Sequence, residues 1–219
     1  MRTTPTYIID FDSTFTKVEA LDVLAGIVME GKENKHVIES SITDITIQAM
    51  TGALSFDKAL KQRLDLLEIN KESLNKLITR LRTEISDSFL QNESYIRANA
   101  HSIYIISGGF KDFIIPVVAR FGITADHVFA NEFIFDTDGN VTGFDKTNPL
   151  SQPKGKVTLV KSLHLQGEVI VIGDGYTDYE IREAGYADKF YLFTENVRRE
   201  NLVDKADKIV NSFDDIIEK

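Results

Sequence analysis

Two short apolar runs, far apart in the chain, each end in aspartate. The first, Ile8-Ile9, leads directly into Asp10 and Asp12. The second, residues 169–173, leads directly into Asp174. A short continuous apolar run is typical of a buried strand in a parallel sheet. Ligands bind beyond the carboxyl ends of such strands. The pattern therefore predicts an α/β fold in which carboxylates from distant parts of the chain meet at one site.

The expected site has the composition of a magnesium site. Asp178 follows Asp174 about one helical turn later and adds a further carboxylate. Mg²⁺ is typically bound by one or two carboxylates together with phosphate oxygens and water. We therefore expect magnesium-dependent phosphate chemistry, with Mg²⁺ as the cofactor.

The composition narrows the class of protein. With 219 residues, 42% of them hydrophobic and 27% charged, the chain can form one or two globular domains. Its formal net charge of −9 argues against a nucleic-acid or anionic-membrane partner. It contains no cysteine, which excludes disulfides, thiolate metal sites and a cysteine nucleophile.

The expected location and assembly follow from the same reading. Residues 1–5 lead into a strand interrupted by Asp10 rather than into the apolar core of a signal peptide. No apolar run approaches the length of a membrane span. We expect a cytoplasmic protein that is a monomer or a homodimer.

The apolar spacing predicts how the chain is divided. Helical spacing runs from about residue 18 to residue 81 and is broken near positions 31, 52 and 68–71, which indicates about four helices. Beyond it, alternating signals indicate strands at 6–10, 102–106, 128–130, 168–172 and 189–193, helices at 110–121, 154–164, 176–184 and 213–218, and a hairpin over 132–144.

Alternating strands and helices imply a parallel sheet with right-handed crossovers. The sequence therefore predicts a Rossmann-like core formed by residues 1–16 and 91–219. An all-helical cap, residues 17–90, is inserted after the first strand. Because the first strand ends in Asp10, we expect the cap to lie over the carboxyl end of the sheet.

Four motifs occur in a fixed order at expected strand ends or helix starts. They are Asp10-Phe11-Asp12-Ser13-Thr14, Ser107-Gly108-Gly109, Lys154, and Gly173-Asp174-Gly175-x-x-Asp178. This order resembles the haloacid-dehalogenase-like phosphatases, from residue 6 to about residue 195. The resemblance implies that family's fold and its phosphoryl-transfer chemistry.

The resemblance also implies roles for the two carboxylates of the first motif. Asp10 matches the nucleophile that forms an aspartyl-phosphate, which divides one difficult step into two. Asp12 matches the general acid and base, and neighbouring negative charge would raise its pKa for that task. The implied Mg²⁺ ligands are the side chains of Asp10 and Asp174, the backbone carbonyl of Asp12, and Asp178 directly or through water.

The remaining motifs would bind the phosphoryl group. Ser107 and the backbone N–H groups of Gly108 and Gly109, at a helix start, match the phosphoryl-oxygen ligands. Two lysines, Lys154 and Lys156, stand at the start of the next helix. In similar members of the family, this segment resembles Lys-Gly-Lys-Val or Lys-Gly-Glu-Ile, and the first lysine is the active one. On that basis we expect Lys154 in the site and Lys156 in solvent.

The cap motifs resemble those of the phosphoserine phosphatases. They are Glu19 after Asp12-Ser13-Thr14, then Ala49-Met50-Thr51-Gly52-x-Leu54-x-Phe56, then Arg63-x-x-Leu66-Leu67. Phosphoserine carries an ammonium that Glu19 could pair and a carboxylate that the Arg63 guanidinium could bind. Met50 and Phe56 would form the pocket wall and exclude water. The competing interpretation is structural: Glu19 as a helix-start acid, Arg63 as a surface residue, Met50 and Phe56 as cap core.

Three functions stay open at this point. The first is hydrolysis of phosphoserine, the last step of serine synthesis. The second is hydrolysis of another small phosphomonoester, or transfer of its phosphoryl group to an acceptor such as homoserine. The third is a phosphate- or metal-binding module without turnover, which is disfavoured because no catalytic position is substituted.

Overall fold

A parallel sheet forms the centre of the computed structural model, which describes residues 5–50 and 53–217. Its strand order is β3-β2-β1-β6-β7-β8, with all neighbours parallel. The strands are β1 Thr6–Ile9, β2 Ile103–Phe110, β3 Val128–Asn131, β6 Val169–Gly173, β7 Lys189–Phe193 and β8 Lys208–Val210. The α/β fold class predicted from the sequence is confirmed. The strands that lead into Asp10 and Asp174 are adjacent, with Ile9 opposite Ile172.

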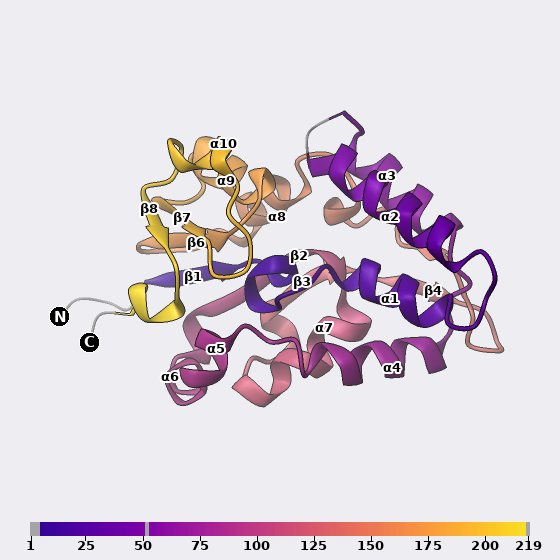
Figure 1. The fold of residues 1–219 in the computed structure, drawn as a ribbon. Coiled ribbons are helices and arrows are strands. Elements are labelled where there is room, and N and C mark those ends of the chain that lie inside the picture. The colour runs from indigo at the N-terminus through magenta and orange to yellow at the C-terminus, as the bar shows by residue number, and fades with distance from the viewer. Residues whose placement is uncertain (1–4, 51–52, 218–219) are drawn as a thin grey trace.

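Both faces of the sheet are covered by helices. Tyr7 and Ile9 belong to one buried apolar cluster and Ile8 to the other, because successive strand residues point to opposite faces. Helices α8, α9 and α10 lie on one side of the strands and α5, α6 and α7 on the other (Figure 1). Their bounds are α5 Asp87–Gln91, α6 Glu93–Ala98, α7 Lys111–Val118, α8 Gly155–Leu163, α9 Tyr176–Glu183 and α10 Glu200–Val203.

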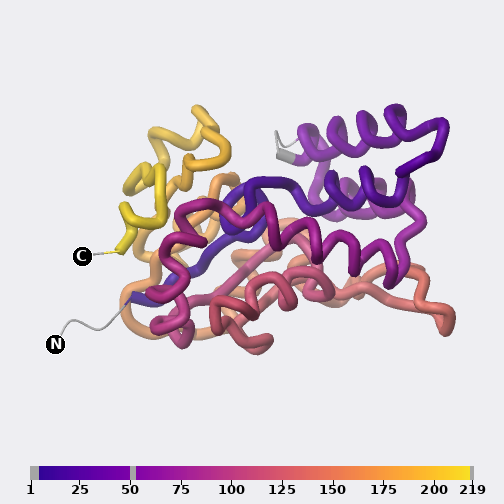
Figure 2. Tube along the Cα trace, turned by 60° about the horizontal axis from the view of Figure 1, so that its bottom comes forward, coloured from indigo at the N-terminus to yellow at the C-terminus, as the bar shows by residue number. Residues whose placement is uncertain are grey.

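Four helices occupy the chain between β1 and the α5–α6 pair. They are α1 Ala20–Val28, α2 Lys35–Met50, α3 Phe56–Asp65 and α4 Lys71–Leu81. Figures 1 and 2 both place α1, α2 and α3 together at one end of the molecule, away from α10 and β8. Leu24, Leu60 and Leu77 of these helices are fully buried, as the 3.6-residue apolar spacing requires.

A two-stranded hairpin joins this helical segment to the sheet. Strands β4 Phe133–Phe135 and β5 Val141–Phe144 pair antiparallel, as the sequence predicts. Val141 N donates to Ile69 O at 2.8 Å, and Lys71 N donates to Gly139 O at 3.1 Å. The start of α4 is therefore hydrogen-bonded to the hairpin.

The C-terminal segment differs from the prediction. The prediction of a helix over residues 213–218 is wrong for the part that the structure describes. Residues 213–217 form only a 3₁₀ turn, at Phe213–Asp215. Short 3₁₀ turns also occur at Ala100–Ser102, Ala119–Phe121, Ala125–His127 and Pro149–Ser151. Helix α10 and strand β8 were not predicted, because four and three residues are too short to show an apolar period. No helix in the described part of the chain is long and apolar enough to cross a membrane.

Candidate active site

The loop that follows β1 is a single turn of π-helix, Phe11–Phe15. Asp10 caps it, since its Oδ1 accepts a hydrogen bond from Phe11 N at 2.8 Å. Within the turn Asp12 is extended and Ser13 has a φ of 54°. For a residue with a Cβ this backbone region costs of order 1–3 kcal/mol and persists only where the surroundings fix it. The turn therefore depends on neighbouring segments for support.

Three carboxylates converge at the carboxyl end of the sheet. Asp10 follows β1, Asp174 follows β6 and Asp178 lies in the first turn of α9, and each offers an oxygen within 4.8 Å of the others. A Cβ added at Gly173 would stand 2.3 Å from Asp178 Cγ, so a glycine there lets that carboxylate approach. Asp174 and Asp178 are buried. A closely spaced donor set made only of carboxylate oxygens fits Mg²⁺.

The lysine in contact with these carboxylates is Lys156. Its Nζ lies 2.8 Å from Asp10 Oδ1 and 2.7 Å from Asp178 Oδ1, and the side chain is buried. Burial lowers the pKa of the Lys156 ammonium, but the charges of Asp10 and Asp178 outweigh burial and raise that pKa above its usual value.

The expectation that Lys154 occupies the site is corrected by the geometry. Lys154 is the exposed N-cap of α8, with a φ of 58°, and the helix begins only at Gly155. Gly155 packs so closely that an added Cβ would lie 2.2 Å from Pro149 O. This packing fixes the start of α8, and the first helical turn then directs Lys156 into the carboxylate cluster.

Asp174 has two further partners that the sequence did not reveal. Arg199 donates from Nε and Nη2 to Asp174 Oδ2, at 2.8 and 2.7 Å. Thr14 Oγ1 lies 3.4 Å from Asp174 Oδ1. Burial, followed by the charge of Asp10, raises the pKa of Asp174, and Arg199 opposes that shift.

Asp12 and Glu19 lie at the junction between the π-turn and α1. Asp12 Oδ1 accepts from Ala20 N at 2.7 Å, and Ser13 Oγ donates to Glu19 Oε1 at 2.6 Å. Burial, and next the charge of Glu19, raises the pKa of Asp12 well above its usual value. Burial, and next the charge of Asp174, raises the pKa of Glu19 to about 7. Both carboxyl groups therefore retain protons more strongly than ordinary acids do.

Arg63, from α3, is buried and faces the same junction. Its Nη1 donates to Thr46 Oγ1 at 3.3 Å, and Thr46 Oγ1 in turn lies 3.4 Å from Asp22 Oδ1. Burial lowers the pKa of Arg63, and the charge of Glu19 is the largest opposing effect. The Nε of Arg63 is buried and has no hydrogen-bond partner within the described part of the chain. A buried donor without a partner is rare in native proteins, so this guanidinium is suited to bind an anionic ligand.

The Ser107-Gly108-Gly109 motif lies inside the end of β2, because this strand continues to Phe110 before α7 begins. The motif therefore lies immediately before the start of α7, whose N-cap is Phe110. Ser107 Oγ accepts from Gly109 N at 2.9 Å, so that N–H already has a partner. A Cβ added at Gly108 would stand 2.6 Å from Cζ of Phe56. The Phe56 ring, from α3, therefore lies directly against the end of β2.

The prediction that Met50 lines the pocket concerns a side chain outside the described part of the structure. Met50 ends α2, and its side chain and residues 51–52 lie outside the described residues.

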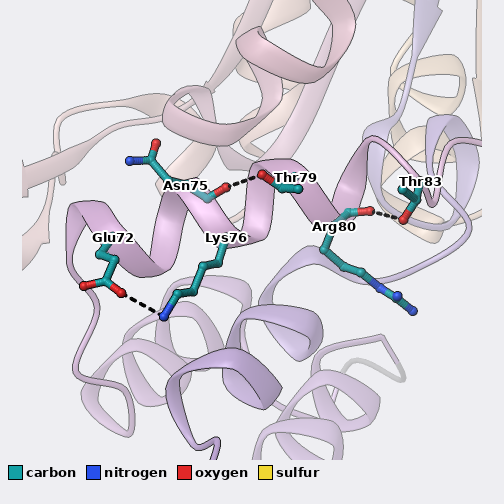
Figure 3. Close-up of a pocket in the computed structure, with 6 residues that line it drawn as sticks. All are labelled: Glu72, Asn75, Lys76, Thr79, Arg80 and Thr83. Carbon is teal, nitrogen blue, oxygen red and sulfur yellow. Dashed lines mark hydrogen bonds and ion pairs between the residues drawn. The ribbon is translucent and has the colours of Figure 1, made fainter.

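A shallow pocket of about 540 Å³ lies elsewhere, on the exposed face of α4. Figure 3 shows its side chains along this helix. Lys76 Nζ pairs with Glu72 at 2.8 Å, and Thr79 Oγ1 donates to Asn75 O at 2.9 Å. These are ordinary contacts between residues four apart on a solvated helix. The chemistry of the chain therefore points to the carboxylate cluster rather than to this pocket.

Comparison with known proteins agrees with this fold. The family model for haloacid dehalogenase-like hydrolases matches residues 8–182. The chain therefore belongs to the haloacid dehalogenase-like hydrolase family, as its motifs predict.

Individual relatives are phosphatases by name. The chain is 32% identical over 211 residues to the chloroplastic phosphoserine phosphatase of Arabidopsis thaliana, covering 95% of this chain and 69% of that protein. It is 32% identical over 212 residues to phosphoserine phosphatase of Homo sapiens, covering 95% and 89%. A solved phosphoserine phosphohydrolase-like protein from Francisella tularensis superposes with a TM-score of 0.85 at 28% identity, covering 97% and 98%.

Proposed function

We propose that the chain is a Mg²⁺-dependent phosphatase that hydrolyses O-phospho-L-serine. The observation that carries this proposal is a chain of buried charges: Glu19 interacts electrostatically with Asp10 and Asp174, and Arg63 interacts in turn with Glu19 and Asp12. The buried Nε of Arg63 has no hydrogen-bond partner among the residues that the structure describes, which suits a ligand carboxylate. The similarity to two proteins named phosphoserine phosphatase supports the same substrate.

The proposed reaction has two steps at Asp10. A carboxylate oxygen of Asp10 attacks phosphorus, and the bond between phosphorus and the seryl oxygen breaks. Asp12 donates its proton to that oxygen, so serine leaves as an alcohol. Asp12 then accepts a proton from water as the water oxygen attacks the phosphorus of the aspartyl-phosphate. Inorganic phosphate and the Asp10 carboxylate result. The raised pKa of Asp12 favours the protonated form that the first step requires.

The proposed metal ligands are the side chains of Asp10 and Asp174, the backbone carbonyl of Asp12, and Asp178 directly or through water. Bound Mg²⁺ would neutralise charge on the phosphoryl oxygens. The role proposed for Lys156 is to hold the Asp10 carboxylate in place and to add positive charge beside the phosphoryl group. Its contacts with Asp10 and Asp178 support that role.

Substrate selection is proposed to come from the helical segment, residues 17–90, acting as a cap over the core of residues 1–16 and 91–219. Glu19 would pair with the substrate ammonium and Arg63 with its carboxylate. Phe56 and Met50 would exclude water, and Ser107 with the backbone of Gly108 and Gly109 would hold phosphoryl oxygens. For this, the Gly109 N–H would exchange its present hydrogen bond to Ser107 Oγ for one to the ligand.

Because phosphoserine hydrolysis yields serine, we propose a role in cytoplasmic serine synthesis.

A panel of phosphomonoesters tests the proposal directly. Purified protein with Mg²⁺ should release phosphate from phosphoserine with a higher kcat/KM than from phosphothreonine, glycerol phosphate or an aryl phosphate. The same reactions in EDTA should be silent. Equal rates on every ester would refute the assigned substrate, and transfer to added homoserine without phosphate release would indicate a phosphotransferase. No turnover of any ester would leave a binding module.

A further inference from the structure

Asn196 lies in the loop between β7 and α10 and contacts segments far away in the sequence. Its Nδ2 lies 3.1 Å from Ser13 O, 3.3 Å from Thr14 O and 3.3 Å from Thr16 O. It also lies 2.7 Å from Ser86 Oγ. One side-chain amide therefore faces four acceptors from both segments that connect the sheet to the helical insertion.

The orientation of this amide follows from its partners. Three of the four are backbone carbonyls, which only accept hydrogen bonds, and the Asn196 amide nitrogen is a donor with two hydrogens. The amide oxygen in the same place would face three carbonyls without a hydrogen between them. The two N–H groups of Asn196 are shared among these four acceptors. They therefore hold the carbonyl groups of Ser13, Thr14 and Thr16 close together.

The carbonyls belong to the least regular part of the site. Ser13, with its φ of 54°, lies between Asp12 and Thr14, so its backbone conformation sets where Asp12 lies. The next residues form the connection to the cap. Thr16 and Ile85 form an isolated antiparallel β-bridge, and Ser86 Oγ donates to Thr14 O at 2.6 Å.

The loop that carries Asn196 is itself fixed at both ends. On one side Glu195 accepts hydrogen bonds from the backbone and hydroxyl of Ser88, the former at 3.1 Å. On the other side Arg199 holds Asp174 Oδ2. The loop therefore spans the distance between the cap connection and the carboxylate cluster, and Asn196 is its contact with the π-turn.

We infer that Asn196 is a positioning residue for the nucleophile loop. Its amide holds the strained π-turn against the two segments that connect sheet and cap, and thereby fixes Asp12 and the cap relative to Asp10. The consequence for turnover rests on the proposed function. The mechanical part of the inference does not, because it concerns the backbone of residues 13–17 and 84–86.

The test replaces the amide with a group of nearly the same shape. Asn196→Asp removes both N–H donors and directs a carboxylate oxygen towards the carbonyls, and Asn196→Ala leaves space in which water can donate. Asn211→Asp is the matched control, because Asn211 is exposed and its Oδ1 accepts from Thr194 Oγ1, a role that a carboxylate keeps. All four proteins are compared by amide hydrogen exchange, Mg²⁺ titration calorimetry and steady-state kinetics.

Both Asn196 variants should exchange faster at the amides of Thr16, Lys17 and Ser86, with unchanged protection in β6 and β7. They should bind Mg²⁺ more weakly, and kcat/KM should fall roughly tenfold to a hundredfold through kcat, the range expected for small displacements of reacting groups. Alanine should be milder than aspartate, and Asn211→Asp should match the parent protein.

Uniformly faster exchange that includes β6 and β7 would show a merely structural residue and overturn the inference. Parent-like exchange and Mg²⁺ affinity would overturn it as well. Exchange and calorimetry need no substrate, so they decide the matter even if the parent protein fails to hydrolyse phosphoserine.

Discussion

The Lys156 ammonium lies 2.8 Å from Asp10 Oδ1, although 146 residues separate the two in the chain. The same ammonium lies 2.7 Å from Asp178 Oδ1. It therefore stands between two carboxylates of the candidate metal site, buried from water. A buried cation in this position keeps neighbouring carboxylates from repelling one another and sets the orientation of Asp10.

The first prediction separates the two lysines at the start of α8. Lys156→Ala should lower kcat/KM for phosphoserine at least roughly a hundredfold, because it removes a buried charge-assisted contact to Asp10. Lys154→Ala should retain nearly the parent activity, since Lys154 is exposed. Steady-state kinetics on both variants, with circular dichroism to verify folding, makes the comparison. Loss of activity in Lys154→Ala alone would restore the assignment made from the sequence.

The choice between these lysines shows what the sequence could not decide. Lys154 caps α8 and Lys156 lies in its first turn, but the sequence motif does not show which of the two side chains the helix directs into the site. That direction depends on where α8 begins, which is set by the contact of Gly155 with the Pro149 carbonyl. The Pro149 carbonyl can approach this closely only because Gly155 has no Cβ, and such a backbone contact leaves no apolar pattern in the sequence.

The sheet, by contrast, could be predicted well. Tyr7 to Ile9 and Val169 to Ile172 form continuous apolar runs because both faces of these strands are covered. Their ends then place Asp10 and Asp174 side by side through strand pairing alone. The helices of the insertion were expected from their apolar spacing, although α2 leaves Val37 and Ile47 exposed.

The supporting residues of the site left no signal. Arg199 lies in the charged stretch Arg198-Arg199-Glu200, which has the appearance of a solvated surface. Asn196 lies in a loop without periodicity, and its partners are backbone carbonyls. Thr46 lies within a helix, where its contact with Arg63 depends on how α2 and α3 pack. Such contacts follow from tertiary packing rather than from residue spacing.

The second prediction concerns the nucleophile. Asp10→Asn should fold normally and lose turnover by several orders of magnitude, because an amide cannot form the covalent intermediate. The Oδ1 of the asparagine can still accept from Phe11 N, so the hydrogen bond that caps the start of the π-turn remains. Mass spectrometry of acid-quenched protein should detect a phosphorylated aspartate in the parent only. The exposed Asp138→Asn is the control, and substantial activity in Asp10→Asn would exclude this route.

The third prediction uses the pKa of Glu19, which burial raises from 4.5 to about 7. The folded protein then holds this proton more tightly than the unfolded chain, so the free energy of unfolding decreases as pH rises from about 4.5 to about 7. Glu19→Gln cannot ionise. It should therefore be more stable than the parent by roughly 1–3 kcal/mol near pH 8, and about equal near pH 4.

Urea denaturation in EDTA at both pH values measures this difference. Glu68→Gln is the control, because Glu68 is exposed and pairs with Lys32 at the surface. A Glu19→Gln variant with the same stability difference at both pH values would show that Glu19 ionises as an ordinary acid.

The last prediction tests the substrate through Arg63. Arg63→Ala should reduce kcat/KM for phosphoserine far more than for an aryl phosphate, which has no carboxylate to bind. Removing the partner of a buried charged group costs roughly 2–5 kcal/mol, which corresponds to about a 30-fold to several-thousand-fold loss. Arg80→Ala, on the exposed face of α4, should leave both substrates unchanged. Arg63→Lys should recover little activity, because a single ammonium does not reproduce the planar guanidinium. An equal loss on both substrates would mean that Arg63 serves folding or closure of the cap, and the selectivity for an amino-acid phosphate would then have to come from other residues.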